Sequence, residues 1–183
     1  MEILRESTPL TDNDCFMIFS RKKSCFDFPL HTHKEMELNL VINAAGASRV
    51  IGNHVGTIGD MELMLVSGDT PHAWFTDRCK SEEIHEITLQ FSPDLLDDKF
   101  LNRNPMGALK QLFDEARRGV LFSRETTELL APRIRELYEQ GSSGGMKPVL
   151  DMLMILNSLS LCQERRLLSD TTFIQKKMKS HSA

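Results

Sequence analysis

Two histidines one residue apart, with a glutamate close behind them, form the segment best equipped for chemistry. The run reads His31-Thr-His33-Lys-Glu-Met-Glu37-Leu-Asn39. Side chains at alternate positions of a β-strand point to the same face. Neutral imidazoles and a carboxylate that converge in this way can bind a divalent transition metal. The polar residues that would share one face here are His31, His33, Glu37 and Asn39.

A fourth candidate ligand lies further along the chain, in Gly68-Asp-Thr-Pro-His72-Ala-Trp74. His72 joins the set if the fold brings it to the first segment. A structural role stays open, because two histidines one residue apart often only hydrogen-bond to neighbours or lie exposed at a strand end. The donor set does not select the ion, since zinc, nickel, manganese and iron all accept it. The candidate metal ligands are His31, His33, Glu37 and His72.

Three further residues are candidates for contact with a small ligand: Asn39, Trp74 and His85. Asn39 would line a pocket beside Glu37, although a simple hydrogen-bonding role fits as well. Trp74 is the only tryptophan, and it could stack on a ligand or belong to the core. His85 shares a strand face with apolar neighbours, so a hydrogen-bonded core histidine is its alternative.

The first half of the chain carries short β-prone runs separated by turn residues. Many short strands at regular turn spacing indicate a sandwich or a barrel. Glycines at 46, 52, 56, 59 and 68 mark the turns between them. The strands expected from this pattern span residues 15–20, 36–43, 47–51, 61–66, 72–76 and 83–91.

After Phe91 the pattern becomes helical. Ser92-Pro93-Asp94 is typical of a helix start, with serine as N-cap and proline at the first position. A helix is predicted over about 106–118, and another begins at 123–126, where Pro132 should kink it or reset its first turn. Residues 141–145 form a glycine-serine connector.

The last predicted helix, about 148–168, has two apolar stripes. A helix packed on a small domain needs only one. The second stripe favours a partner helix from another subunit, and a helix enclosed within the monomer is the alternative. The first stripe is Val149, Leu153, Leu156 and Leu159, and the second is Leu150, Met154 and Leu161.

Composition limits the protein class. The 183 residues are 40% apolar and 26% charged, which indicates one soluble domain, or one domain with a short appendage. Residues 1–146 carry a net charge of −7 and residues 147–183 carry +3, so the acidic body is a poor phosphate binder. Four scattered cysteines indicate reduced thiols. With no signal peptide and no apolar run long enough to span a membrane, we expect a cytoplasmic protein.

The spacing H-x-H-x-x-x-E from His31 to Glu37, with Gly59-Asp60 and Pro71-His72 behind it, resembles the signature of cupins. These are small β-barrels in which three histidines and one glutamate bind a metal. Cys25 and Ala44 stand where the cupin pattern has glycines. The resemblance implies a mainly β fold with added α-helix: a cupin-like (jelly-roll) β-barrel followed by a C-terminal helical segment.

The order of motifs looks more specifically like the N-terminal sensor half of AraC-type transcription regulators. The resemblance implies a barrel over 1–91, a helical dimerisation segment over 92–170 and a tail over 171–183. The implied function is to bind a small effector, such as a sugar, and to form a homodimer. DNA would be contacted only through a helix-turn-helix half that this chain lacks. The matching segments are Phe28–Glu37, Gly59-Asp60, Thr70–Trp74, Leu89-Gln-Phe91 and 116–122.

Two other functions stay open. One is a metal-dependent cupin enzyme, an isomerase or oxygenase, which would use the three histidines and Glu37 as metal ligands. The other is a binding-only cupin, such as a storage or carrier protein. The long helical extension favours the regulator, because an enzyme built on a single small barrel does not need it.

Overall fold

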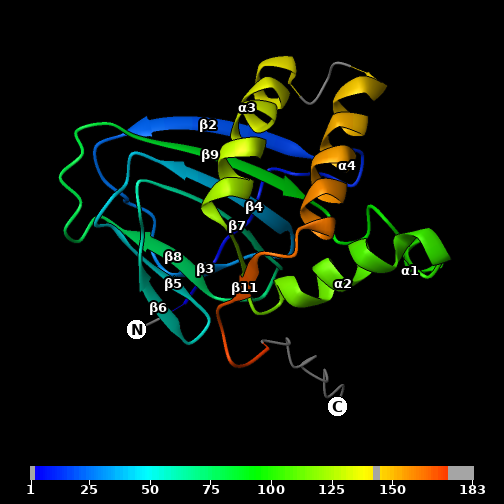
Figure 1. Ribbon diagram of the computed structural model, residues 1–183, viewed down its shortest axis with the longest axis horizontal. Helices are drawn as coiled ribbons and strands as arrows, with labels where there is room; N and C mark the ends of the chain where they lie inside the picture. The colour runs from blue at the N-terminus through cyan, green and yellow to red at the C-terminus, as the bar shows by residue number, and fades with distance from the viewer. Residues whose placement is uncertain (1–2, 142–144, 173–183) are drawn as a thin grey trace, which may run out of the picture.

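The computed structural model describes residues 3–141 and 145–172 of the chain, and its strands form two sheets (Figure 1). In the six-stranded sheet the order is β11–β10–β7–β4–β9–β2, and in the five-stranded sheet it is β1–β3–β8–β5–β6. The large sheet consists of β2 (Met17–Lys23), β4 (Met36–Ile42), β7 (Met61–Val66), β9 (Ile84–Phe91), β10 (Val120–Phe122) and β11 (Arg165–Leu167). The small sheet consists of β1 (Leu4–Arg5), β3 (His31–Thr32), β5 (Ser48–Ile51), β6 (His54–Thr57) and β8 (His72–Phe75).

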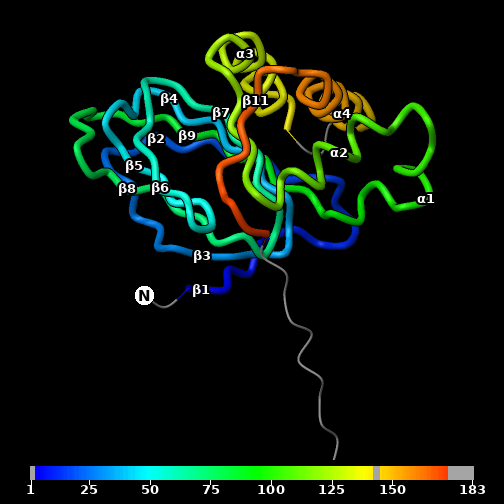
Figure 2. The backbone as a smooth tube through the Cα atoms, turned by 60° about the horizontal axis from the view of Figure 1, so that its bottom comes forward, coloured from blue at the N-terminus to red at the C-terminus, as the bar shows by residue number. Residues whose placement is uncertain are grey.

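Helices cover the large sheet on the side away from the small one. Figure 2 shows α3 and α4 on one side of β4, β7 and β9, with β3, β5, β6 and β8 on the other. The main apolar core lies between this sheet and the helices, and a second cluster fills part of the space between the sheets. The helices are α1 (Asp98–Leu101), α2 (Gly107–Ala116), α3 (Arg124–Gln140) and α4 (Met146–Leu161), with a 3-10 helix at Asn104–Met106.

The two sheets do not close into a barrel. Among the described residues, every ladder belongs to one sheet or the other, and none joins the two. The chain returns from the helices to add β10 beside β7 and β11 beside β10, so these strands extend the large sheet sideways. The fold is therefore a β-rich arrangement of two sheets with a layer of helices, and the mainly β and α composition was predicted correctly.

All six strands expected from alternation are present, within a few residues at their ends. The strands that were missed are β1, β3, β6, β10 and β11, of two to four residues each. Segments this short contain too few residues to show a period of two. The sequence pattern changes from strand-like to helical at residue 91, but the segments before and after it share the large sheet, because β10 pairs with β7.

Two helix boundaries differ from those expected from the sequence. Ser92 caps no helix: its hydroxyl accepts a bond from the Asp94 amide, and the first helix begins only after Asp97, whose carboxylate accepts from the Phe100 amide. The last helix ends at Leu161 rather than near 168, because β11 has to reach β10. Helix α3 is continuous through Pro132. The connector at 142–144 and the tail from 173 lie outside the described residues.

Strand β4 positions the chemistry. Its even-numbered apolar residues, among them Leu38 and Leu40, pack in the main core, while Glu37 and Asn39 face the space between the sheets. Alternation along a strand produces this separation into two faces.

In the described part of the chain, no helix is both long enough and apolar enough to cross a bilayer.

Candidate metal and ligand site

The four candidate metal ligands come together between the two sheets. His31 lies on β3 and is the cross-strand partner of His72 on β8, while Glu37 reaches them from β4 of the facing sheet. His33 lies in the turn that joins β3 to β4. One ligand atom from each residue lies within 4.8 Å of the others, and all four residues are buried. The expectation that His31, His33 and Glu37 lie on one face of a single strand is therefore wrong, because a turn divides the segment and sends its two halves to different sheets. The fold nevertheless brings these three side chains and His72 together.

Backbone carbonyls fix the orientation of all three imidazoles. In each ring, Nδ1 lies at hydrogen-bond distance from a carbonyl oxygen, which can only accept. Nδ1 therefore carries hydrogen, and in the neutral ring Nε2 presents its lone pair. This is the tautomer that binds a metal through Nε2. The bonds run from His31 to the Pro29 carbonyl (2.9 Å), from His33 to that of Glu35 (2.9 Å) and from His72 to that of Thr70 (2.8 Å).

Glu37 is the centre of the polar contacts. Its Oε2 lies 3.0 Å from His33 Nε2 and 4.0 Å from His72 Nε2, and it also accepts a bond from Gln90 Nε2 at 3.0 Å. Its Oε1 accepts from Asn39 Nδ2 at 3.3 Å. Burial by itself raises the pKa of Glu37, but the His33 hydrogen bond and the nearby histidines bring the pKa down to about 2. Glu37 is thus a buried carboxylate anion.

Without a metal ion, a proton lies between His33 and Glu37. Burial lowers the pKa of His33, but its hydrogen bond to Glu37 and the surrounding carboxylates outweigh that and raise the pKa overall. For His72, burial dominates and lowers the pKa to about 3, so that ring is neutral. The proton between His33 and Glu37 therefore belongs to His33, and a metal ion would replace it.

The donor set fits a transition metal. His72 Nε2 is fully buried and has no hydrogen-bond partner in the described part of the chain, so its lone pair is aimed at nothing but the other ligands. Ligand atoms about 2.1 Å from a common ion lie at most about 4.2 Å apart. To bind one ion, the four ligand atoms would have to move closer to one another by a few tenths of an ångström. Three imidazole nitrogens and one carboxylate are suitable ligands for zinc, nickel, manganese or iron.

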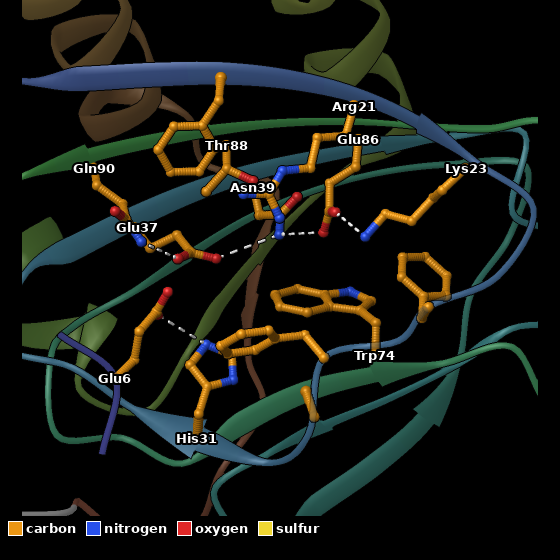
Figure 3. Close-up of a pocket in the computed structure, with 14 residues that line it drawn as sticks. Glu6, Arg21, Lys23, His31, Glu37, Asn39, Trp74, Glu86, Thr88 and Gln90 are labelled. Carbon is orange, nitrogen blue, oxygen red and sulfur yellow. Dashed lines mark hydrogen bonds and ion pairs between the residues drawn. The ribbon is translucent and has the colours of Figure 1, made fainter. Parts of the chain in front are cut away.

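A cavity of about 90 Å³ lies next to the ligands, between the sheets. Figure 3 shows Glu37, Asn39, Glu86 and Gln90 projecting into it from one sheet, and His31 and Trp74 from the other. Two of the predicted ligand-binding residues, Asn39 and Trp74, are thus in its wall. The third is not: His85 lies on the opposite face of β9, where its Nε2 pairs with the Ser20 hydroxyl at 2.6 Å.

Several wall residues were missed by sequence reasoning. On β9, Glu86, Thr88 and Gln90 form the polar face that faces the cavity, and their alternation with apolar residues was a usable signal. Glu86 accepts from Asn39 Nδ2 at 3.1 Å and pairs with Lys23 Nζ at 2.6 Å. Glu6 comes from the N-terminus through β1, and no local pattern marks it.

Comparisons with known proteins give a partial likeness of fold. No protein-family profile matches the chain, and no curated protein matches it either. Among solved structures, ToxT from Vibrio cholerae matches with a TM-score of 0.45 and 12% identity over 90% of this chain and 61% of that one. An apo variant of ToxT matches with a TM-score of 0.48, 14% identity and coverages of 80% and 54%. The AraC-like transcriptional activator CuxR matches with a TM-score of 0.41, 14% identity and coverages of 78% and 45%. The chain thus spans less than two thirds of each.

Proposed function

We propose that this chain is the effector-binding part of an AraC-type transcription regulator, and that it holds a divalent metal ion next to its ligand cavity. The observation that carries the proposal is the set of four buried donors, with every imidazole presenting Nε2, at the edge of a polar cavity. The sequence resemblance to AraC-type sensors supplies the biological role. The site residues are His31, His33, Glu37 and His72 for the ion, with Asn39 and Trp74 for the ligand.

The size and polarity of the cavity narrow the choice of effector. About 90 Å³ is the space of roughly three water molecules, whereas sites for drug-sized ligands begin at about 300 Å³. A ligand of few atoms with oxygen or nitrogen donors fits this volume. A sugar would require the walls to move apart. A bound metal ion supplies a positive charge that attracts an oxygen of the ligand.

The protein's own residues would orient such a ligand. Asn39 is held by Glu37 on one side and by Glu86 on the other, so its amide has a defined direction. Trp74 presents its ring within the cavity wall, next to His72. A small polar ligand would therefore meet a fixed amide on one sheet and an aromatic ring on the other.

We also propose that α4 pairs with a second copy of the chain. The apolar residues of its outer face remain at least about half exposed, at helical spacing: Met146, Leu150, Met154 and Leu161. Strand β4 lies between the site and the helix layer, because Leu38 and Leu40 belong to the core that the helices share while Glu37 and Asn39 contact the cavity. A ligand that prefers one arrangement of β4 would bias the helical interface.

The first test is metal binding by the whole chain. We expect calorimetric titration of chelator-treated protein to show one bound zinc, nickel, manganese or iron(II) ion per chain. His72→Ala should abolish this binding, because it removes one of the ligands. His85→Ala is the matched control, since His85 lies on the outer face of β9, and it should bind as the wild type does. Absence of binding by a folded wild type would contradict the metal site.

The second test separates a sensor from an enzyme. Metal-loaded protein is mixed with single monosaccharides and small carboxylic acids, and its melting temperature and the compound's recovery are both measured. If the chain is a sensor, its melting temperature rises to a plateau as the concentration of the compound increases, and the compound is recovered unchanged. Conversion of the compound would instead support the alternative, a metal-dependent isomerase or oxygenase.

A further inference from the structure

We propose that Glu6 is a fifth donor to the metal ion, supplied by the N-terminal strand β1, so that the ion fastens β1 to the small sheet. This inference rests on the proposed metal site and adds a residue to it. The carboxylate Oε2 of Glu6 lies 3.6 Å from His31 Nε2, and the side chain is three-quarters buried in the cavity wall. Figure 3 shows Glu6 beside His31, with a dashed line that joins its carboxylate to the His31 ring.

The backbone fixes this position. The Glu6 amide donates to the Thr32 carbonyl at 2.8 Å, and the Leu4 amide donates to the Leu30 carbonyl at 3.0 Å. These bonds set the parallel register in which Leu4 lies opposite His31. The side chain of Arg5 forms an ion pair with Asp69, which lies in the loop between β7 and β8. Glu6 is therefore held beside the metal ligands by its own amide and by the contacts of Leu4 and Arg5.

The chemistry of the contact calls for a cation. His31 donates Nδ1–H to the Pro29 carbonyl, which leaves its Nε2 facing the Glu6 carboxylate at 3.6 Å. His72 Nε2 faces Glu37 Oε2 in the same way, at 4.0 Å. A proton can join one such pair at a time. A divalent ion among the rings would attract both carboxylates at once.

Five donors change which ions are preferred. Three imidazole nitrogens and two carboxylates exceed the four ligands of a tetrahedral zinc site. An ion that accepts six donors would then have room for one more, which the ligand of the proposed sensor could supply. Because carboxylate ligands suit manganese better than they suit soft-ligand ions, Glu6 should matter more for Mn²⁺ than for Zn²⁺.

The experiment compares Glu6→Gln with Glu35→Gln in the whole chain, using competition with a chelator to measure affinity for Mn²⁺ and Zn²⁺. Glu35 is a matched control because its carboxylate lies 3.8 Å from His33 Nδ1, on the side of the ring that faces away from the ion. We expect Glu6→Gln to weaken Mn²⁺ binding by about 10- to 100-fold and Zn²⁺ binding by less. Glu35→Gln should weaken both by less than about tenfold.

A second readout tests the fastening of β1. Hydrogen exchange at the Glu6 amide should slow when Mn²⁺ is added to the wild type, and Glu6→Gln should lose this effect. If Glu6 only pairs with a protonated His31, its removal would leave metal affinity unchanged or raise it, and the proposal would be wrong. A wild type that binds no ion would overturn the metal site itself, whereas equal binding by wild type and Glu6→Gln overturns only the role of Glu6.

Discussion

At the scale of single residues, the backbone orients the imidazoles before any ion arrives. The carbonyls that hold the three Nδ1 atoms lie two residues away along the chain in each case. Such local bonds constrain each ring with little help from the rest of the fold. Glu37 then supplies the negative charge, which the proton on His33 balances in the metal-free protein.

This pairing makes a prediction about acid stability. In metal-free protein, the pKa of Glu37 falls from 4.5 in the unfolded chain to about 2 in the folded one, which corresponds to about 3 kcal/mol. A lowered carboxyl pKa stabilises the fold above pH 4.5, and that stabilisation is lost as the pH falls toward 2. His33 is the other half of the same pair, and its raised pKa means the contribution is complete below pH 6.5 and lost as the pH rises through the folded value.

The measurement is urea unfolding of wild type and Glu37→Gln in chelator at a series of pH values. We expect the wild type to be the more stable between about pH 4.5 and 6.5. The difference between the two should shrink steadily below pH 4.5. A difference that stays constant down to pH 2 would show that Glu37 is not held as an anion.

At the scale of elements, the site depends on how closely one loop approaches another. The loop between β7 and β8 lies against the turn that carries His33: the Asp69 amide donates to the His33 carbonyl at 2.8 Å. At Gly68 a Cβ atom would lie 2.1 Å from the Lys34 carbonyl oxygen, a distance that no side chain can occupy. A glycine is therefore required for the two loops to bring His33 and His72 together.

Gly68→Ala should separate these loops. We expect a loss of about 3 kcal/mol or more in the free energy of unfolding, at or above the usual cost of overpacking, together with weaker metal binding. Gly59→Ala is the control, because a Cβ there would meet nothing within 4 Å, and it should change stability by no more than about 0.5 kcal/mol. Denaturant unfolding and metal titration of both variants provide the comparison. Equal behaviour of the two variants would contradict the close loop contact.

At the scale of the whole molecule, the two faces of the large sheet have different surroundings. One side is sealed by helices in a continuous apolar core, and the other faces a polar cavity. The helix layer buries Met152, Ile155, Leu156 and Leu159 of α4, whereas Val149 and Leu153 of the first predicted stripe are only half-buried. The second predicted stripe, Leu150, Met154 and Leu161, remains about half exposed or more. An exposed apolar stripe of this kind is the surface that the proposed dimer would cover.

Replacing Leu150 and Met154 together by aspartate should disrupt that assembly. A buried carboxylate without a partner opposes association, so we expect wild type to sediment as a dimer at micromolar concentration and the double variant as a monomer. Val55→Asp is the control: Val55 is equally apolar and 68% exposed, but lies on β6 of the small sheet. Far-ultraviolet circular dichroism checks that all variants remain folded. A monomeric wild type would contradict the proposed dimer.

Much of the local structure follows from the sequence alone. Alternation along 36–42 determined that Glu37 and Asn39 face one way and Met36, Leu38, Leu40 and Ile42 the other, because the period of a strand is two. The helical period likewise aligned Leu130, Ile134 and Leu137, which are all buried in α3. Over 146–161 the period showed two apolar stripes but not which of them is buried. The choice of His31, His33, Glu37 and His72 rested on residue type and spacing, and the fold brings these four together.

Only the tertiary structure decided the rest. Glu6 meets His31 through a parallel ladder between segments 27 residues apart, and β11 stops α4 early by pairing with β10 more than 40 residues before it. Such pairings depend on which distant edges are available, so no local period encodes them. The same reason explains the open two-sheet fold and the placement of His85: whether a strand face meets a cavity or a helix layer is set by what packs on it, not by the strand itself.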